Sequence, residues 1–229
     1  MAIQFYDLAG DDAARRFSPF CWRTRMALKH KGLDFTAIPW RFTDKDVIAF
    51  SGQDKVPVLQ DDGRTVCDSW TIAEYLDERY PQAPSLLGGP DRRSFARFVK
   101  HWTETTVHGP LLRILAKDIF DRLHPKDREY FRTSRERRFG TTLEAFTSER
   151  DQAREQLRQG LLPMRRLVAE QPFLNGAGAA MADYIVFGAF QWARSTSSYP
   201  LLADGDPVAA WRERMLDLYG GYARAFPSG

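Results

Sequence analysis

The sequence predicts an α/β domain followed by an all-helical domain. Within the first eighty residues, short runs of β-forming residues alternate with segments of helical spacing, which predicts a sheet with helices packed against it. Residues 83–91 contain two prolines and two glycines, a composition typical of a linker. Beyond them helical spacing continues and the β pattern almost disappears. We therefore expect an α/β domain at residues 1–82, a linker at 83–91 and a helical domain at 92–229.

The first domain is expected to follow the order β-α-β-α-β-β-α. Ser18 and Pro19 form a favourable helix start, and Gly32 suits the end of that helix because glycine readily adopts positive φ. Gly63 marks a hairpin turn between two β runs, and Pro81 stops the last helix. Strands are expected at 3–8, 35–40, 56–60 and 64–67, and helices at 19–31, 44–50 and 69–79.

The second domain shows helical spacing in five long segments. His108, Gly109 and Pro110 interrupt the first of them. A bend there would aim His108 at the cleft between the domains, and a core or surface position is the more common alternative for a histidine. Helices are expected at 92–117, 129–147, 151–170, 181–196 and 207–225.

The composition is that of an ordinary soluble globular protein. Of 229 residues, 43% are hydrophobic and 28% are charged. The first residues lack the pattern of a signal peptide, and no stretch is apolar for long enough to cross a bilayer. Two cysteines, Cys21 and Cys67, cannot form a disulfide scaffold. We therefore expect a cytoplasmic protein without a membrane partner.

The net charge of +3 and the pI near 8.9 raise the question of nucleic-acid binding. The densest basic patch, residues 127–138, holds five arginines interspersed with acidic residues. Mixed signs are more typical of a solvated helix with internal ion pairs than of a nucleic-acid surface. We expect no nucleic-acid partner.

The segment from Ser18 to Cys21 carries the strongest chemical signal. It follows the first predicted strand and opens the first predicted helix. A hydroxyl at such a position caps the helix, and the free N–H groups and the helix dipole there also favour an anion. A thiol with an ordinary pKa of about 8.5 is mostly protonated at neutral pH, and a site of this kind lowers that pKa. Capping and thiolate binding are compatible.

Three motifs resemble those of glutathione transferases. The segment from Ser18 to Cys21 resembles a glutaredoxin redox motif whose leading Cys is replaced by Ser, and Val56-Pro57 resembles the Val–cis-Pro of thioredoxin-fold proteins. The segment from Asp68 to Leu76 is similar to the acidic-Ser-x-x-Ile-x-x-Tyr-Leu segment of glutathione transferases. The helical second half also matches the family's arrangement, so the resemblance covers the whole chain. It implies a thioredoxin-like first domain and a homodimer.

The buried core helix of the family also has a counterpart. The segment from Leu174 to Gly176, followed by Asp183, resembles the start of that helix. Ala180 departs from the family's pattern, which has Ser or Thr there, so half of the helix's capping pair is missing.

A closer similarity is to bacterial β-etherase-type glutathione transferases and related fungal serine-type transferases. It rests on the segments 18–32, 61–63, 68–78 and 134–140. Those bacterial enzymes cleave β-aryl ethers of lignin fragments with glutathione. The sequence reaches residue 229, and we expect no counterpart of the etherases' long C-terminal tail. The resemblance therefore implies glutathione as co-substrate more strongly than it implies the ether substrate.

The resemblance also implies how glutathione would be bound. Asp68 would receive the γ-glutamyl ammonium, and Ser69 with nearby N–H groups would hold its carboxylate. A helix N-cap is the alternative for Ser69. Val56 would pair its backbone with the cysteinyl unit, exposed by a cis Pro57, and Lys55 would reach the glycyl carboxylate or stay solvated.

The resemblance implies that Ser18 donates a hydrogen bond to the glutathione sulfur. Tyr6 is the rival, because some transferase classes use a Tyr at the end of the first strand, and we favour Ser18. Cys21 has no partner Cys at position 18, so we interpret it as a small buried residue, and Cys67 likewise. A glutathione-dependent thiol oxidoreductase acting through Cys21 and a non-catalytic binding protein for hydrophobic ligands remain alternatives. A hydrolase triad is disfavoured because no Gly-x-Ser-x-Gly motif is present.

An aromatic electrophile requires apolar side chains from both domains. The four histidines lack metal-ligand spacing, and we expect no metal. The candidates for the electrophile pocket are Phe17, Phe20, Trp102, His108, Ile114, Tyr130 and Phe139.

Overall fold

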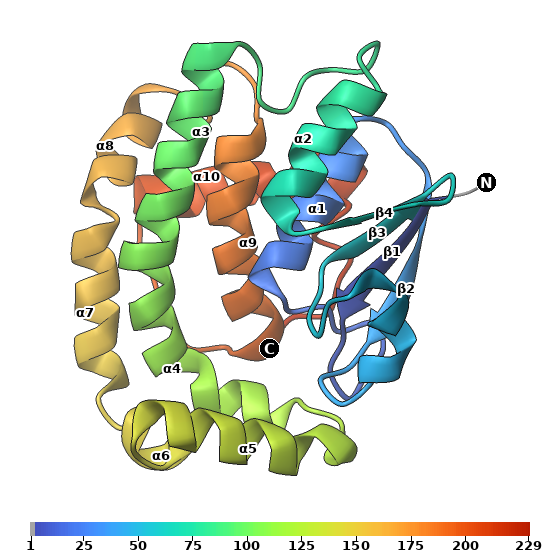
Figure 1. Cartoon of the computed structure of the whole chain (residues 1–229). Coiled ribbons are helices and arrows are strands. Elements are labelled where there is room, and N and C mark those ends of the chain that lie inside the picture. The colour runs from blue at the N-terminus through green and yellow to red at the C-terminus, as the bar shows by residue number, and fades with distance from the viewer. Residues whose placement is uncertain (1–2) are drawn as a thin grey trace.

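The computed structural model describes residues 3–229 and contains a four-stranded sheet beside a set of helices (Figure 1). The strand order is β2-β1-β3-β4, with β1 parallel to β2 and antiparallel to β3. A mixed sheet of this kind with helices against it confirms the predicted thioredoxin-like first domain. The strands are β1 Ile3–Leu8, β2 Phe35–Trp40, β3 Val58–Asp61 and β4 Arg64–Cys67.

Two helices of the first domain lie between the sheet and the second domain (Figure 1). They are α1 Pro19–His30 and α2 Ser69–Arg79, and both begin where the sequence predicts. The weak helix predicted at 44–50 is instead the 3-10 helix Lys45–Ser51, which ends at Gly52 with a φ of 67°. The predicted linker 83–91 lies after α2 and overlaps the first two residues of the next helix.

The second domain is helical, as predicted, but four of the five expected helices are interrupted. In the last of them, 207–225, the backbone leaves helical geometry at residues 218–220. A π-helical turn, Thr103–Val107, divides the first, so the break comes directly before His108. Gly140, with a φ of 70°, ends the second, and Pro163 stands in the first turn of a new helix in the third. The helices are α3 Pro90–Trp102, α4 His108–Asp121, α5 Pro125–Phe139, α6 Leu143–Phe146, α7 Arg150–Gly160, α8 Leu162–Glu170, α9 Met181–Thr196 and α10 Pro207–Gly221.

Helix α9 forms the centre of the core and packs against α1, joining the two domains (Figure 1). Its first turn is held from inside by Asp183, whose carboxylate accepts the N–H groups of Leu174 at 2.7 Å and Ala180 at 3.2 Å. The indole N–H of Trp211 donates to the same carboxylate at 3.0 Å. These hydrogen bonds stabilise the start of α9 although Ala180 has no hydroxyl to cap it.

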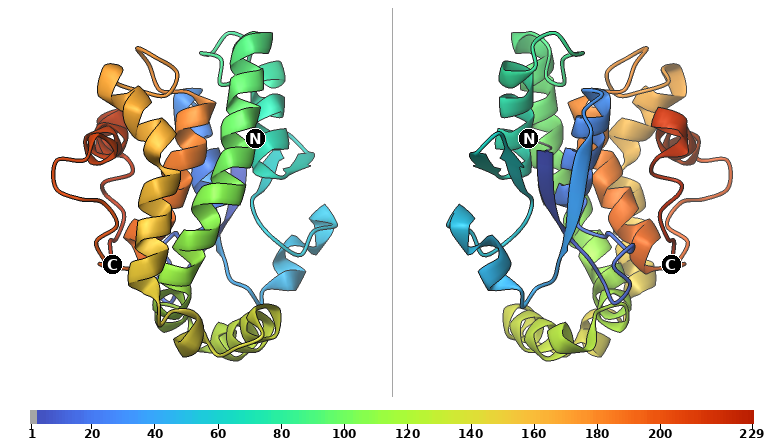
Figure 2. Two further views of the ribbon diagram at one scale, coloured as in Figure 1. Left: turned by 90° about the vertical axis from the view of Figure 1, so that its left-hand side faces the viewer. Right: turned by 90° about the vertical axis from the view of Figure 1, so that its right-hand side faces the viewer.

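Helix α5 lies across one end of the long helices (Figure 2). Its buried Asp127 accepts the backbone N–H groups of Phe42 and Thr43, both at 3.0 Å, and therefore fastens the loop after β2 to the second domain. Within residues 3–229, no helix is both long and apolar enough to span a membrane.

Candidate active site

A cavity of about 760 Å³ opens between the two domains at the start of α1. Both domains contribute to its walls, and ligand pockets often lie at such domain interfaces. Its lining residues are Leu8, Phe17, Ser18, Pro19, Phe20, Trp40, Phe42, Lys45, Asp54, Lys55, Val56, Asp68, Lys100, Glu104, His108, Gly109, Leu112, Ile119, Tyr130, Phe131, Arg135, Arg138 and Trp192.

Ser18 caps α1 at the wall of this cavity. The backbone is extended there, and the Ser18 hydroxyl oxygen accepts the N–H of Cys21 at 3.2 Å. The residue is buried, with 4% of it exposed, and within residues 3–229 its hydroxyl donates no hydrogen bond to nitrogen or oxygen, although the buried Cys21 thiol lies close to it. The hydroxyl therefore has a free donor at the positive end of a helix dipole.

The start of α2 forms the adjoining part of the site. Asp68, not Ser69, is the N-cap: one carboxylate oxygen of Asp68 accepts the N–H groups of Trp70 at 2.9 Å and Thr71 at 3.1 Å. Asp68 has a φ of 71°, a left-handed value that costs a non-glycine residue energy and is often found at binding sites. The buried Ser69 hydroxyl has no partner within residues 3–229. The capping alternative for Ser69 is thus wrong, and its hydroxyl keeps an unused hydrogen-bonding group, although Ser69 lies outside the cavity lining.

A smaller cavity of about 150 Å³ joins the two helix starts through the loop before β3. Lys55 and Val56 line both cavities, and Pro57 lines the smaller one. The Val56–Pro57 peptide bond is cis, which confirms the expectation from the resemblance. The residues predicted from three separate sequence motifs therefore meet at one place.

Tyr6 and Cys21 lie outside the cavity lining. The Tyr6 hydroxyl donates to the Gln60 side chain at 3.2 Å, and its ring packs against Phe50. Cys21 is fully buried, and burial raises the pKa of its thiol well above the ordinary value. A protonated thiol without solvent access is a poor nucleophile.

Four of the seven candidates for the electrophile pocket line the large cavity: Phe17, Phe20, His108 and Tyr130. The other three lie elsewhere. Ile114 is fully buried among the helices, Phe139 stacks on Phe146 with ring centroids 3.8 Å apart, and Trp102 packs at the edge of the core. Helical spacing identifies apolar faces, but it does not say which face meets the other domain.

The aromatic residues that line the large cavity form what we call the aromatic wall: Phe17, Phe20, Trp40, Phe42, Tyr130, Phe131 and Trp192. Several of them were not predicted from the sequence. Phe42 lies at its centre, with ring centroids 5.6 Å from Phe131 and 6.2 Å from Tyr130. Trp40 and Trp192 complete the lining aromatic residues. The signal available in the sequence was the Trp40-Arg41-Phe42 segment, where aromatic residues continue past the end of a strand.

A buried ion pair borders the cavity beside Ser18. Arg23 of α1 is 1% exposed, and its guanidinium donates to Glu104 of the π-helical turn at 2.8 Å. Lys100 also donates to Glu104, at 3.0 Å. Burial alone would raise the pKa of the Glu104 carboxyl, but the hydrogen bonds from Arg23 and Lys100 outweigh it and lower the pKa. The pair holds α1 against the second domain.

His108 lies against this ion pair, edge-on to Phe20 and to Trp192, with ring centroids 5.6 and 5.9 Å apart. Burial, with a smaller contribution from the nearby Arg23 charge, lowers the pKa of His108 to about 4. The imidazole is therefore neutral at physiological pH. Its Nε2 atom is buried and has no partner within residues 3–229.

Both domains of the chain match known protein families. Residues 17–79 match the family model of the glutathione S-transferase N-terminal domain, and residues 94–214 match that of the C-terminal domain. The chain belongs to the glutathione S-transferase family.

Solved glutathione S-transferase structures resemble the chain over almost its whole length. A glutathione S-transferase of Ceriporiopsis subvermispora, solved in complex with glutathione, is 26% identical, with a TM-score of 0.78 over 98% of this chain and 94% of that one. A glutathione transferase from Phanerochaete chrysosporium is 27% identical, with a TM-score of 0.78 over 99% of this chain and 95% of that one.

Curated relatives match over a shorter region. A probable glutathione S-transferase of Solanum tuberosum is 36% identical over 93 residues, which are 39% of this chain and 42% of the relative. The maleylacetoacetate isomerase of Pseudomonas aeruginosa is 36% identical over 95 residues, which are 38% of this chain and 45% of the relative. The chain thus spans less than half the length of these curated relatives.

Proposed function

We propose that this glutathione S-transferase family member is a transferase of the serine type, in which Ser18 donates a hydrogen bond to the glutathione sulfur. The observation that carries the proposal is the free hydroxyl proton of Ser18 at the first turn of α1, on the wall of the large cavity. A hydrogen bond to the charged form, together with the helix dipole, lowers the pKa of the thiol and keeps the thiolate populated at neutral pH.

In this proposal the γ-glutamyl group of glutathione lies at the start of α2. Asp68 uses one carboxylate oxygen to cap the helix, which leaves the other for the ammonium group. Because the Asp68 cap already occupies the N–H groups of Trp70 and Thr71, the γ-glutamyl carboxylate accepts hydrogen bonds from the hydroxyl and the N–H of Ser69. The affinity for glutathione therefore depends on two adjacent residues: Asp68 binds the ammonium group, and Ser69 binds the carboxylate.

The remainder of the tripeptide follows the loop before β3. The Val56 backbone pairs with the cysteinyl unit as an added strand, and Pro57 holds that loop beside the smaller cavity. Lys55 reaches the glycyl carboxylate. It lines both cavities and makes no ion pair within the described part of the chain. This path places the sulfur between Ser18 and the aromatic wall.

The aromatic wall supports an aryl electrophile, and we propose a β-aryl ether ketone as its substrate class. The thiolate attacks the carbon next to the carbonyl, a C–S bond forms, the C–O bond breaks, and the phenolate leaves with the bonding electrons. Holding the two reactants side by side supplies much of the rate. The carbonyl activates the carbon, so no strong general acid is required.

Incubation with glutathione and a model aryl ether ketone tests this function. Equal amounts of free phenol and glutathione thioether are expected, and neither product should exceed the background rate with Ser18→Ala. Conjugation of a chlorodinitrobenzene without any phenol release would overturn the ether substrate. Saturable binding of a hydrophobic dye without conjugation of either compound would overturn the transferase and indicate a binding protein.

The family resemblance also carries a proposal about assembly, a homodimer. Sedimentation equilibrium tests it. A mass of twice 26.3 kDa supports the dimer, and a mass of 26.3 kDa at micromolar concentration contradicts it.

A further inference from the structure

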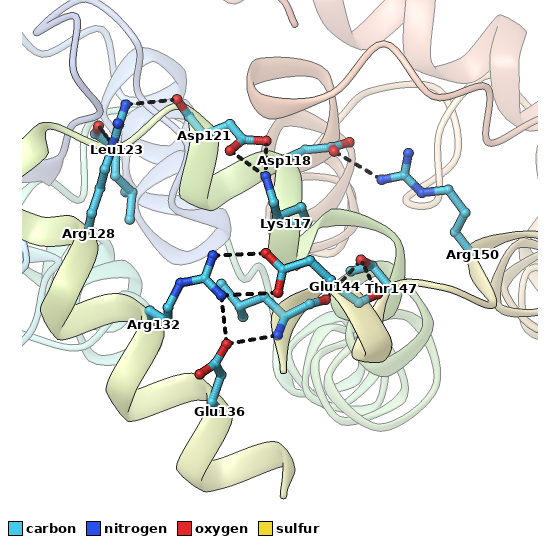
Figure 3. Close-up of polar contacts among 11 residues, drawn as sticks. Lys117, Asp118, Asp121, Leu123, Arg128, Arg132, Glu136, Glu144, Thr147 and Arg150 are labelled. Atoms are coloured by element: carbon cyan, nitrogen blue, oxygen red, sulfur yellow. Dashed lines mark hydrogen bonds and ion pairs between the residues drawn. The ribbon is translucent and has the colours of Figure 1, made fainter. Parts of the chain in front are cut away.

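Helix α5 carries arginines whose environments differ sharply. Arg132 pairs with Glu136 at 2.8 Å and with Glu144 at 2.9 Å, and Arg128 donates to the backbone carbonyl of Leu123 at 3.3 Å (Figure 3). These two arginines are engaged within the protein, as the mixed charge pattern predicts. Their guanidinium groups already have partners within the protein and do not require a ligand.

Arg135 and Arg138 do not follow this pattern. Both line the large cavity, and neither has a carboxylate within ion-pair distance among residues 3–229. The polar contact of the Arg135 guanidinium is its bond to the Ser134 hydroxyl, at 3.0 Å. Burial lowers the pKa of Arg135, and the charge of Arg138 adds to this effect, whereas the neighbouring Tyr130 hydroxyl opposes it. Two mutually repelling cations on one cavity wall would be stabilised by an anion there.

The same wall is built to hold an aromatic ring. The Arg135 guanidinium lies 4.7 Å from the ring centroid of Phe131 and 5.2 Å from that of Phe42. Stacking on these rings fixes the planar guanidinium, so less side-chain entropy is lost when it binds a carboxylate. A ring resting on Phe42 would lie beside the Arg135 guanidinium, in the same cavity that Arg138 lines.

The acidic residues of the cavity do not neutralise the charges of Arg135 and Arg138. Glu104 is held by Arg23 and Lys100, and Asp68 caps α2. Asp54 is in contact with Lys45, whose Nζ atom lies 3.8 Å from its carboxylate. Each cavity carboxylate therefore has a local role of its own.

We propose that Arg135 and Arg138 form an anion subsite that receives the carboxylate of an aromatic electrophile. The assignment to an electrophile rests on the proposed transferase function, whereas the binding of the carboxylate does not require glutathione. The subsite selects acidic aromatic compounds over their neutral esters because a charge-assisted, bidentate contact is available only to the carboxylate.

Equilibrium binding of an unreactive dinitrobenzoate and of its methyl ester, without glutathione, tests the subsite. We expect the wild-type protein to bind the acid more tightly than the ester. Arg138→Gln should weaken binding of the acid about ten-fold, as should Arg135→Met, with little change for the ester. Arg137→Gln is the matched control: it removes one charge from the same helix at an exposed position outside the cavity, and binding should not change.

Equal affinity for acid and ester in the wild-type protein would overturn the subsite, as would an equal loss in Arg137→Gln. Arg138 is exposed, so its variant keeps the test valid if Arg135→Met fails to fold. Turnover of a chlorodinitrobenzoate and its ester with glutathione separates the two proposals. Carboxylate-selective binding with no conjugation of either compound would support the subsite and refute the transferase, and the reverse result would refute the subsite alone.

Discussion

Gly188 of α9 lies so close to Pro19 of α1 that a β-carbon at position 188 would come within 2.3 Å of the Pro19 carbonyl oxygen. The atom in the way belongs to the backbone, so it cannot move aside by a change of rotamer. The close approach holds the first turn of α1, including Ser18, against the core helix of the second domain. The position of the candidate donor therefore depends on a residue 170 positions further along the chain.

Gly188→Ala should destabilise the protein by about 1–3 kcal/mol, because an added methyl group in a packed contact forces backbone shifts. Urea denaturation followed by circular dichroism measures the change. Gly178→Ala is the control, since its β-carbon would meet no atom within 4 Å. An unchanged free energy of unfolding for Gly188→Ala would mean that α1 and α9 are not held this closely.

Glu104→Gln should cost about 3 kcal/mol of stability, because it leaves the buried Arg23 charge without its partner. Lys100→Gln removes the more exposed partner of the same carboxylate and should cost less than about 1 kcal/mol. Thermal unfolding of the two variants side by side checks the order. Equal losses would contradict the dominant role of the buried contact.

His108 should make stability depend on pH between about 6.5 and 4. Its folded-state pKa of about 4 lies below the unfolded value of 6.5, so the unfolded chain takes up the proton first as pH falls. The folded state is fully favoured above pH 6.5 and loses up to about 3 kcal/mol by pH 4. Denaturation at several pH values should show a smaller loss for His108→Gln than for the wild type. Parallel curves would contradict the low pKa.

Cys21→Ala should retain the conjugating activity of the wild type, because the Cys21 thiol is fully buried and protonated. Alkylation of the native protein by iodoacetamide, read by mass spectrometry, should modify the partly exposed Cys67 and spare Cys21. Loss of a glutathione-dependent disulfide reductase activity in Cys21→Ala would instead favour the thiol oxidoreductase alternative.

The elements of the fold follow closely from the sequence because each carries its own local signal. The strands Ile3–Leu8 and Phe35–Trp40 and the helix Met181–Thr196 have the predicted bounds. Gly140 and Pro163 are local signals for two of the helix interruptions, whereas the π-helical turn depends on a tertiary contact. The π-helical turn Thr103–Val107 carries Glu104 to the buried Arg23, a relation across 81 positions that no local pattern contains.

The candidate site was predicted where its residues belong to motifs, and less well where they come from packing. Phe42 reaches the cavity wall because Asp127 binds its backbone N–H from another domain. Arg135 and Arg138 share a helix with ion-paired arginines, and the sequence does not indicate which of them face the cavity. Asp68 is the N-cap with a φ of 71°, a conformation that is uncommon for aspartate and that the sequence pattern does not indicate.

The pKa of glutathione bound to the protein tests the central claim most directly. Titration of the thiolate absorbance in the ultraviolet should give a pKa well below the free-thiol value of about 8.5 for the wild type and for Tyr6→Phe. Ser18→Ala should return it toward that value, whereas Ser18→Thr, which keeps a hydroxyl and a cap, should preserve much of the decrease. A pKa that is unchanged in Ser18→Ala and raised in Tyr6→Phe would contradict the assignment of Ser18 as the donor.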